Sequence, residues 1–473
     1  MEDDELLQRA REMKAEQQQQ EKENVESQNI QEEYERAARV LFDMVSESRD
    51  DEFKVHRLEV NGADYTRSSV FESVFGQTMK SRTLGEIINN TRIAGNRLQR
   101  LGIFKDVDIT FDAAKDPFAS PDSIDVLVNV QERSRFWAKT GTEIGDGEGN
   151  MNSSVNFRNA FGAGETFEAN ISFGTRTSSA FQISLSKPLN ANPDAVVDVT
   201  AYQQTRNNKL YSSHEELTRG GLLRFRGISR FGYHELVYDT VWRQIHKLDD
   251  HASLCVRKEA GHSVKSSIAH VFMHDRRNDS VLPSSGYYLR LAQEFAGPGG
   301  DVSFIKNEVE AQANYSLGKG FILSSSLRSG LLVPLFGEAS HINDRFFLGG
   351  PTSVRGFRYA GIGPRDGKDA LGGDAYWSGG ISLYTPLPKV KSDALKGHIF
   401  INGGTLLPSV DTTKPIPETI NRLVQTPSVA IGAGLVYRHS FVRLELNLCL
   451  PISVTATDQF KKGIQLGVGM SFM

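Results

Sequence analysis

Few positions in this 473-residue chain bring together residue types that could do catalytic or metal chemistry. Gly367-Lys368-Asp369 lacks the Ser or Thr that follows Lys in a phosphate-binding loop. His270 and His274 have the spacing of two metal ligands on a helix, but on a strand they would lie about 13 Å apart, too far to share one ion. No Gly-x-Ser-x-Gly or His-Glu-x-x-His motif occurs. The sequence therefore predicts a protein that is not an enzyme and holds no metal or other cofactor.

One turn between two apolar stretches carries opposite charges beside Pro and Gly. Asp275 and Arg277 stand two residues apart, and Pro283 and Gly286 follow them. These residues predict a β-hairpin with a local ion pair between Asp275 and Arg277. A functional role for the turn is the open alternative.

A glycine-rich loop contains the tripeptide Arg355-Gly356-Phe357 and, further on, Asp374. Such a loop either is exposed or folds back into the interior of the protein. In the interior, the guanidinium of Arg355 needs an acceptor, because an unpaired charge shielded from water costs free energy. We predict that the loop lies inside and that losing Arg355 harms assembly more than losing Arg358.

Composition excludes several classes of protein. The formal net charge is −4 and the sequence pI is near 6.3, so the basic footprint of a nucleic-acid-binding protein is missing. No stretch reaches the roughly 18 consecutive apolar residues of a transmembrane helix. Cys255 and Cys449 lie far apart and are expected to be free thiols, not a redox pair. The N-terminus lacks the features of a secretory signal or a transit peptide, which favours synthesis in the cytosol.

From residue 136 onward, apolar residues alternate with polar ones at the period of a β-strand. In residues 442–450 this alternation predicts Leu444, Leu446 and Leu448 on an outer face and Arg443, Glu445 and Asn447 on an inner face. Alternation alone fits a soluble sandwich as well as a membrane barrel. Tilted membrane strands need roughly 9–11 residues, and residues 136–473 have room for about sixteen of them. We predict a mainly β protein with a sixteen-stranded antiparallel transmembrane β-barrel.

Two segments precede the predicted barrel. Residues 1–50 are acidic and rich in Glu and Gln, and their apolar residues are too scattered for a sustained heptad seam. They predict a mobile, partly helical arm, with a coiled coil as the alternative.

Residues 51–135 show one strand, two helical stretches that end at Gly102, and two further strands. This order predicts a small α+β domain of the form βααββ.

Three groups of residues resemble the outer-membrane barrel-assembly superfamily. They are the loop Val354-Arg355-Gly356-Phe357, the turn from Asp275 to Gly286, and the βααββ segment with Leu101-Gly102-Ile103-Phe104, which is similar to a POTRA (polypeptide-transport-associated) domain. Within the superfamily, the chain most resembles the core subunits of the mitochondrial sorting and assembly machinery. The residues that carry this likeness are Gly349 to Ser353, Gly372 to Trp377 and Tyr384 to Pro388. The similarity covers nearly everything after residue 50.

The resemblance implies a barrel in the mitochondrial outer membrane with its POTRA domain in the intermembrane space. It implies that the protein folds and inserts β-barrel precursor proteins without hydrolysing nucleotide, in contact with membrane lipids and metaxin-like peripheral subunits. The alternative is a passive pore or a protein-export channel of the same superfamily. In bacterial relatives the loop arginine meets acidic residues, and the matching positions here are Ser382 and Asn402. Asp374 is therefore the expected substitute acceptor for Arg355.

The first and last strands of such a barrel are expected to pair weakly and to form a lateral gate for an incoming strand. On the first strand, the candidate residues for pairing with a client are Trp137, Lys139 and Thr140. The last strand carries two glycines that weaken it, and its pattern of polar, x, Gly, x, x, apolar, x, apolar resembles the sorting signal of mitochondrial barrel precursors. Its candidate residues are Gln465, Gly467, Gly469, Met470 and Phe472. Plain alternation, as in any last strand, is the other explanation.

Overall fold

A computed structural model describes residues 47–145, 148–174, 177–337, 339–388, 394–410, 416–439 and 442–469. The arm predicted for residues 1–50 therefore lies almost wholly outside the described residues, and so do Met470 and Phe472. The chain divides into two compact units, Met1–Arg133 and Ser134–Met473. Within the described ranges, no helix is long and apolar enough to cross a membrane.

The first unit is a small α+β domain. Its elements are β1 (Lys54–Asn61), α2 (Ser68–Phe75), a 3-10 turn (Thr78–Lys80), α3 (Leu84–Arg100), β2 (Phe104–Ala113) and β3 (Ser123–Glu132). In its sheet, β3 lies in the middle, parallel to β1 and antiparallel to β2. Helix α3 begins after Thr83, whose side chain accepts a hydrogen bond from the backbone N–H of Glu86, and it buries Ile87 and Leu98. The predicted βααββ order is confirmed.

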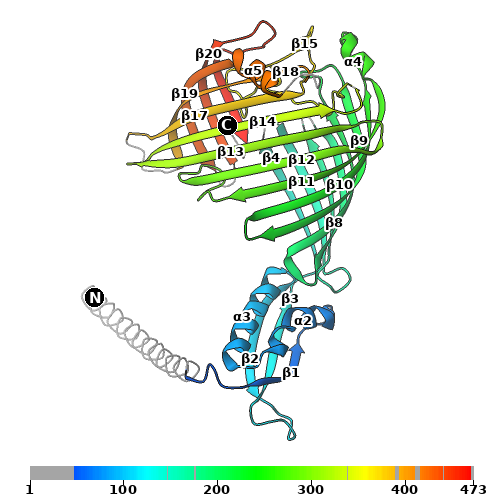
Figure 1. The fold of residues 1–473 in the computed structure, drawn as a ribbon, viewed down its shortest axis with the longest axis vertical. Coiled ribbons are helices and arrows are strands. Elements are labelled where there is room, and N and C mark those ends of the chain that lie inside the picture. The colour runs from blue at the N-terminus through cyan, green and yellow to red at the C-terminus, as the bar shows by residue number, and fades with distance from the viewer. Residues whose placement is uncertain are drawn as a thin grey trace, which may run out of the picture. The chain divides into compact units, whose positions relative to one another are not determined.

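The second unit is a single antiparallel sheet of sixteen strands (Figure 1). Its strands in chain order are β4 (Phe136–Gly145), β5 (Glu148–Arg158), β6 (Thr166–Gly174), β7 (Thr177–Leu189), β8 (Asn192–Asn207), β9 (Glu215–Ser229), β10 (Gly232–His246), β11 (Gly261–Asp275), β12 (Gly286–Gly300), β13 (Phe304–Gly318), β14 (Phe321–Pro334), β17 (Ala375–Pro386), β18 (Leu395–Leu407), β19 (Ser428–His439), β20 (Val442–Ser453) and β21 (Gly463–Gly469). Each strand pairs with the next in this series, and β21 lies beside β4. The sheet therefore curls into the predicted sixteen-stranded barrel.

The connections of the barrel are unequal. The longest runs from β14 to β17, across residues 335–374, and includes the small hairpin of β15 (Arg365–Asp366) and β16 (Asp369–Ala370). Two connections contain helices, α4 (Leu254–Lys258) and α5 (Ile416–Gln425). The alternation from residue 136 onward predicts strands and does not reveal these two helices. The side chain of Ser253 accepts a hydrogen bond from the N–H of Val256 and so caps α4.

The two faces of the barrel wall follow the predicted alternation. On β20, Leu446 and Leu448 are 48% and 62% exposed, whereas Arg443, Glu445 and Asn447 are buried. The apolar side chains project outward, where lipid would cover them, and the polar side chains project into the lumen. The predicted facing of this strand is confirmed.

Adjacent residues of β7 give a sharp test of this facing. Phe181 is exposed on the outer face near the middle of the strand, and Gln182 lines a cavity of about 660 Å³ in the lumen. We expect Phe181→Arg to destabilise the inserted barrel by about 2–4 kcal/mol, and Gln182→Arg to change its stability little, because only the first arginine enters hydrocarbon. Unfolding from lipid vesicles in denaturant measures both values. Equal costs at the two positions would contradict a membrane barrel.

Candidate functional site

The long connection between β14 and β17 packs inside the barrel. Val354, Arg355 and Phe357 are at most 1% exposed, and the apolar members of this loop share one core cluster with residues of the barrel wall. That cluster includes Leu348, Val354, Phe357, Ile362, Leu406 and Ala430. The loop therefore lies in the interior, as the sequence predicts.

Gly356 lets the loop approach the wall closely. Its φ is +86°, and a Cβ at this position would lie 2.9 Å from the Cβ of Ala430. Both the backbone conformation and the short contact require glycine. This close approach brings the neighbouring Arg355 against β20.

The acceptor for Arg355 is Glu445 on β20, at the inner face of the wall. Arg355 Nε lies 2.8 Å from Glu445 Oε2, and Nη2 lies 3.2 Å from Oε1, which makes a bidentate pair. Both side chains are buried. The expectation that Asp374 would replace the bacterial acceptor is wrong, because Asp374 lies against Ser340 and Arg345 instead.

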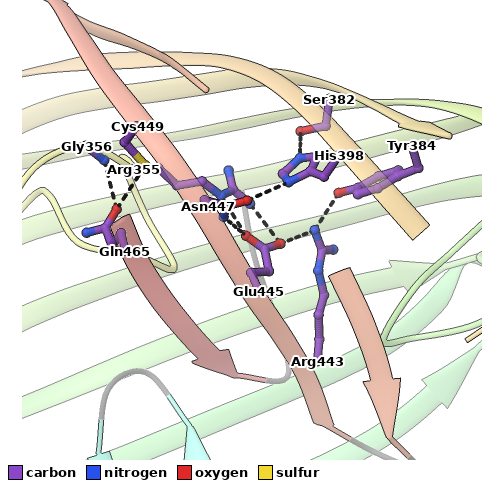
Figure 2. A network of polar contacts seen from close by, with 10 residues as sticks. All are labelled: Arg355, Gly356, Ser382, Tyr384, His398, Arg443, Glu445, Asn447, Cys449 and Gln465. Carbon is purple, nitrogen blue, oxygen red and sulfur yellow. Dashed lines mark hydrogen bonds and ion pairs between the residues drawn. The ribbon is translucent and has the colours of Figure 1, made fainter. Parts of the chain in front are cut away.

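Around Glu445 the lumen holds a connected polar network (Figure 2). Arg443 forms a second ion pair with Glu445, and its guanidinium donates to the hydroxyl of Tyr384 at 2.5 Å. Asn447 donates its amide to Glu445 at 2.7 Å, and its amide oxygen lies 3.3 Å from Nδ1 of His398. One carboxylate is thus shared by two arginines and an amide, which compensates its burial.

The two positions aligned with the bacterial acceptors do not contact Arg355 through any described hydrogen bond. Ser382 lies 3.0 Å from Nε2 of His398, so it reaches Glu445 only through His398 and Asn447. Both polar atoms of the Asn402 side chain are buried without a hydrogen-bond partner in the described part of the chain. The carboxylate that pairs with Arg355 comes from β20 instead.

Gln465 on β21 binds the backbone of the loop. Its Oε1 accepts from the N–H of Gly356 at 2.9 Å, and its Nε2 donates to the carbonyl oxygen of Phe357 at 3.0 Å. The thiol of Cys449 also lies 3.5 Å from Gln465 Oε1. The loop is thereby fastened to β20 by an ion pair and to β21 by a side-chain amide.

The far end of the same loop is fixed by Asp369 in the β15–β16 hairpin. Its carboxylate accepts from the N–H and hydroxyl of Ser213 and from the N–H of Ser253. Burial alone raises the pKa of Asp369, but these hydrogen bonds outweigh it and hold the pKa below its ordinary value. The loop is therefore held near its middle, at residues 355–357, and again at Asp369.

Strands β4 and β21 are the first and last strands of the hydrogen-bonded sheet. β21 pairs with β20 from Gly463 to Gly469, and β4 pairs with β5 along its length. Between β4 and β21, the described residues form no hydrogen-bonded ladder, although the two strands are neighbours. Among the described residues, the seam between β4 and β21 is therefore a place where neighbouring strands of the wall are joined by no ladder.

The predicted gate residues lie beside this seam. Trp137 and Lys139 share one face of β4, with Lys139 Nζ 4.2 Å from the centre of the Trp137 ring. Thr140 lies on the other face, 3.4 Å from the hydroxyl of Ser153. On β21, Gly467 and Gly469 pair with β20 at Glu445 and Arg443. The structure brings these residues to one seam, and their role in pairing with a client stays a prediction.

The charged turn between β11 and β12 forms a local ion pair. Arg277 Nη2 lies 2.7 Å and Nε 2.9 Å from the two carboxylate oxygens of Asp275. Gly286 has a φ of +95°, and a Cβ there would lie 2.1 Å from the carbonyl oxygen of Arg276. Pro283 lies in the connection between the two strands. These contacts account for the motif as a structural turn.

Other candidate chemistry finds no support in the geometry. His270 pairs with His234, at 3.2 Å between ring nitrogens, and His274 contacts the Tyr287 hydroxyl. Among the described residues, no group of three or more His, Cys, Asp or Glu side chains could hold a metal ion. Cys255 is exposed and Cys449 is buried, and both are free thiols, as predicted.

Fold and site together define a class of protein: a membrane β-barrel whose longest loop is fastened inside the lumen to its last two strands. A family model described as the Omp85 superfamily domain matches residues 159–472. A crystal structure of BamA from Haemophilus ducreyi lacking POTRA domains 1–3 has the same fold, with a TM-score of 0.73 at 16% identity, over 88% of this chain and 84% of that one.

Sequence relatives narrow the class further. Sorting and assembly machinery component 50 homolog B of Xenopus laevis is 37% identical over 426 residues, which is 89% of this chain and 90% of the relative. The human homolog is 36% identical over the same shares, and so is a SAM50-like protein of Schizosaccharomyces pombe. The chain therefore belongs to the SAM50 family within the Omp85 superfamily, and the predicted family is confirmed.

Proposed function

We propose that this protein folds β-barrel precursors and inserts them into the mitochondrial outer membrane, by strand exchange at the seam between β4 and β21. The observation that carries the proposal is the missing hydrogen-bonded ladder between these two neighbouring strands in the described residues. Unpaired N–H and C=O groups on a strand edge are a template for another strand. A client strand that pairs with β4 would replace the contact with β21 and enter the membrane as it folds.

The long loop between β14 and β17 is bound to the β21 side of the seam and leaves the edge of β4 unused. Arg355 is bound to Glu445 on β20, and Gly356 and Phe357 are bound to Gln465 on β21. These contacts hold β20 and β21 from inside without using any backbone group of β4. Opening the seam would therefore leave β21 fixed to the loop while the edge of β4 becomes available.

The remaining parts of the proposal follow from family membership. The likeness to SAM50 proteins supports a mitochondrial outer-membrane location, a POTRA role for the βααββ unit in the intermembrane space, and metaxin-like peripheral subunits as partners. Nucleotide hydrolysis is not needed, because strand pairing and burial in lipid supply the free energy of insertion. The competing function is a passive pore or export channel, in which the seam stays closed.

Crosslinking of an arrested barrel precursor tests the proposal directly. Single cysteines are placed at Ala138 on β4 and Leu466 on β21, in a chain that carries Cys255→Ser. The control is Ala292 on β12, which lies midway between β4 and β21 in the strand order. We expect the last strand of the precursor to crosslink to Ala138 and Leu466 and not to Ala292. A precursor that crosslinks to Ala292 alone would favour the passive pore.

Gln465 should control how firmly the loop is attached to β21. Gln465→Leu removes both hydrogen bonds and leaves two backbone groups of the loop unpaired, at about 1–3 kcal/mol each. Gln465→Glu keeps only the acceptor for the Gly356 N–H and adds a second carboxylate near Glu445. We expect faster hydrogen exchange in the peptide containing residues 355–357 for both variants, measured by mass spectrometry. Gln182→Leu, far from the loop, is the matched control, and unchanged exchange in all three variants would contradict the expectation.

A further inference from the structure

Helix α5 lies in the connection between β18 and β19, and one contact fixes its position. The indole Nε1 of Trp377 on β17 donates to the carbonyl oxygen of Leu423 at 2.8 Å. Along a strand, residues four apart share a face, so Trp377 faces the same way as Ile381. Ile381 is 53% exposed on the outer face, whereas the intervening Ser378 is buried. Helix α5 is therefore bound to the outside of the barrel wall.

The neighbouring strand shows where the helix covers the wall. On β18, Ile399 and Ile401 face outward and are 55% and 47% exposed. Thr405 and Leu407 face outward too, because alternate residues of a strand share a face, yet each is only 8% exposed. Helix α5 contacts β17 and β18, and Figure 1 shows it beside the end of β18. The cover over Thr405 and Leu407 is thus on the outer face, at the end of the strand that leads into α5.

The helix presents apolar side chains away from the wall as well. Ile420 and Val424 stand one turn apart and are 52% and 59% exposed. The polar residues of the helix are Glu418, Thr419, Asn421, Arg422 and Gln425. Ile420 and Val424 belong to one apolar stripe of the helix, and no described part of the chain covers them there.

The height of α5 on the wall matches the edge of a bilayer. Ile401 lies at the middle of β18, and Thr405 lies four residues, or about 13 Å, further along the strand. At the tilt of membrane strands this is about 10 Å along the membrane normal, close to half of the roughly 25 Å apolar band. Trp377, which binds the helix, takes the place of an aromatic residue in the interfacial girdle of a barrel.

From these observations we infer that α5 is an interfacial membrane helix, which lies on the lipid side of β17 and β18 with Ile420 and Val424 in the acyl-chain boundary. The occupant is lipid because α5 lies on the same outer face of β17 and β18 as the exposed Ile381 and Ile401, and its own exposed residues Ile420 and Val424 are apolar as well. The polar residues Asn421 and Arg422 would then face headgroups and water. The inference rests on the membrane barrel alone and does not depend on the proposed insertion activity.

Lipid-depth quenching tests this placement. The full-length chain with Cys255→Ser and Cys449→Ser is labelled with a fluorescent thiol probe at Val424→Cys, or at Asn421→Cys as the matched control on the polar side. It is then folded into phosphatidylcholine vesicles that contain nitroxide-labelled lipid. We expect the probe at position 424 to lose fluorescence to nitroxides on the upper acyl chain and to resist aqueous iodide, and the probe at position 421 to show the reverse. A gel-mobility assay confirms that each labelled barrel is folded.

Two results would overturn the inference. In the first, the probes at 424 and 421 are quenched equally by iodide and neither responds to lipid nitroxides, which would leave α5 in water. In the second, the probe at 424 escapes both quenchers only when peripheral subunits are bound, which would make this apolar stripe a protein interface. An added Val424→Glu change, read with a probe at Ile420→Cys, should reduce quenching by lipid nitroxides because the carboxylate draws this stripe toward water.

Discussion

Replacing Arg355 with alanine is expected to destabilise the folded barrel strongly, whereas replacing Arg358 with alanine should change its stability by less than about 0.5 kcal/mol. Arg355 is 1% exposed and bidentate to Glu445, whereas Arg358 is exposed three residues along the same loop. Breaking one partner of a buried ion pair costs up to about 3–5 kcal/mol, and here Glu445 loses one of its two arginines. The measurement is the fraction of heat-resistant barrel on unheated gels as the temperature is raised.

The same network predicts an order among variants. In Arg355→Ala, Glu445 keeps its ion pair with Arg443, so one positive and one negative charge remain. In Glu445→Gln, Arg355 and Arg443 are left as two buried positive charges without a carboxylate between them. We therefore expect Glu445→Gln to lower stability more than Arg355→Ala. If Arg355→Ala were no more harmful than Arg358→Ala, the ion pair would not be what holds the loop.

The sequence was sufficient to predict on which face each residue of β20 lies, but not which lumenal residue meets the loop. Alternation places Glu445 inside, and the structure confirms this. Alternation shows which face of the wall a side chain lies on, but not how far along the barrel axis it lies. That height depends on the stagger of every strand between β14 and β20. Asp374 is close to Arg355 in sequence, whereas Glu445 is 90 residues away and becomes its partner only once the barrel closes.

A second part of the site has no signature in the sequence. The loop sequence reveals Arg355 because its charge demands a partner, but the partners of Gln465 are the N–H of Gly356 and the carbonyl oxygen of Phe357. Every residue except proline has both of these backbone groups, so no pattern of side chains marks them. The sequence therefore places Gln465 in the last strand but does not reveal its contact with the loop.

The helix α5 was missed for a different reason. Its apolar residues Ile420, Leu423 and Val424 follow a helical spacing, but the helix is only ten residues long and stands between strongly alternating strands. A helix of this length is marginal in isolation and depends on tertiary contacts. The contact from Trp377 to Leu423, which supplies such support, links residues 46 positions apart.

The second large effect is expected when β4 is covalently locked to β21. Cysteines scanned along 138–142 and 464–468, in a Cys255→Ser chain, should find pairs with Cα atoms within the roughly 4.4–6.8 Å that a disulfide needs, because the strands are neighbours. We expect the oxidised variant to remain a folded barrel and to lose nearly all precursor insertion, and reduction to restore it. Protease protection of a radiolabelled precursor measures insertion.

A disulfide between β20 and β21 is the matched control for this lock. Leu446 and Leu466 are directly paired across these strands, so Leu446→Cys with Leu466→Cys adds a crosslink that does not bridge the seam. If a client pairs with β4 while β21 stays attached to β20 and to the lumenal loop, this control should insert precursors normally. If the β4–β21 lock also inserted clients at the normal rate, the seam would not open during function, and the passive pore would become the better explanation. The two disulfides differ only in whether β4 can part from β21, so a loss of insertion confined to the first assigns the activity to that seam.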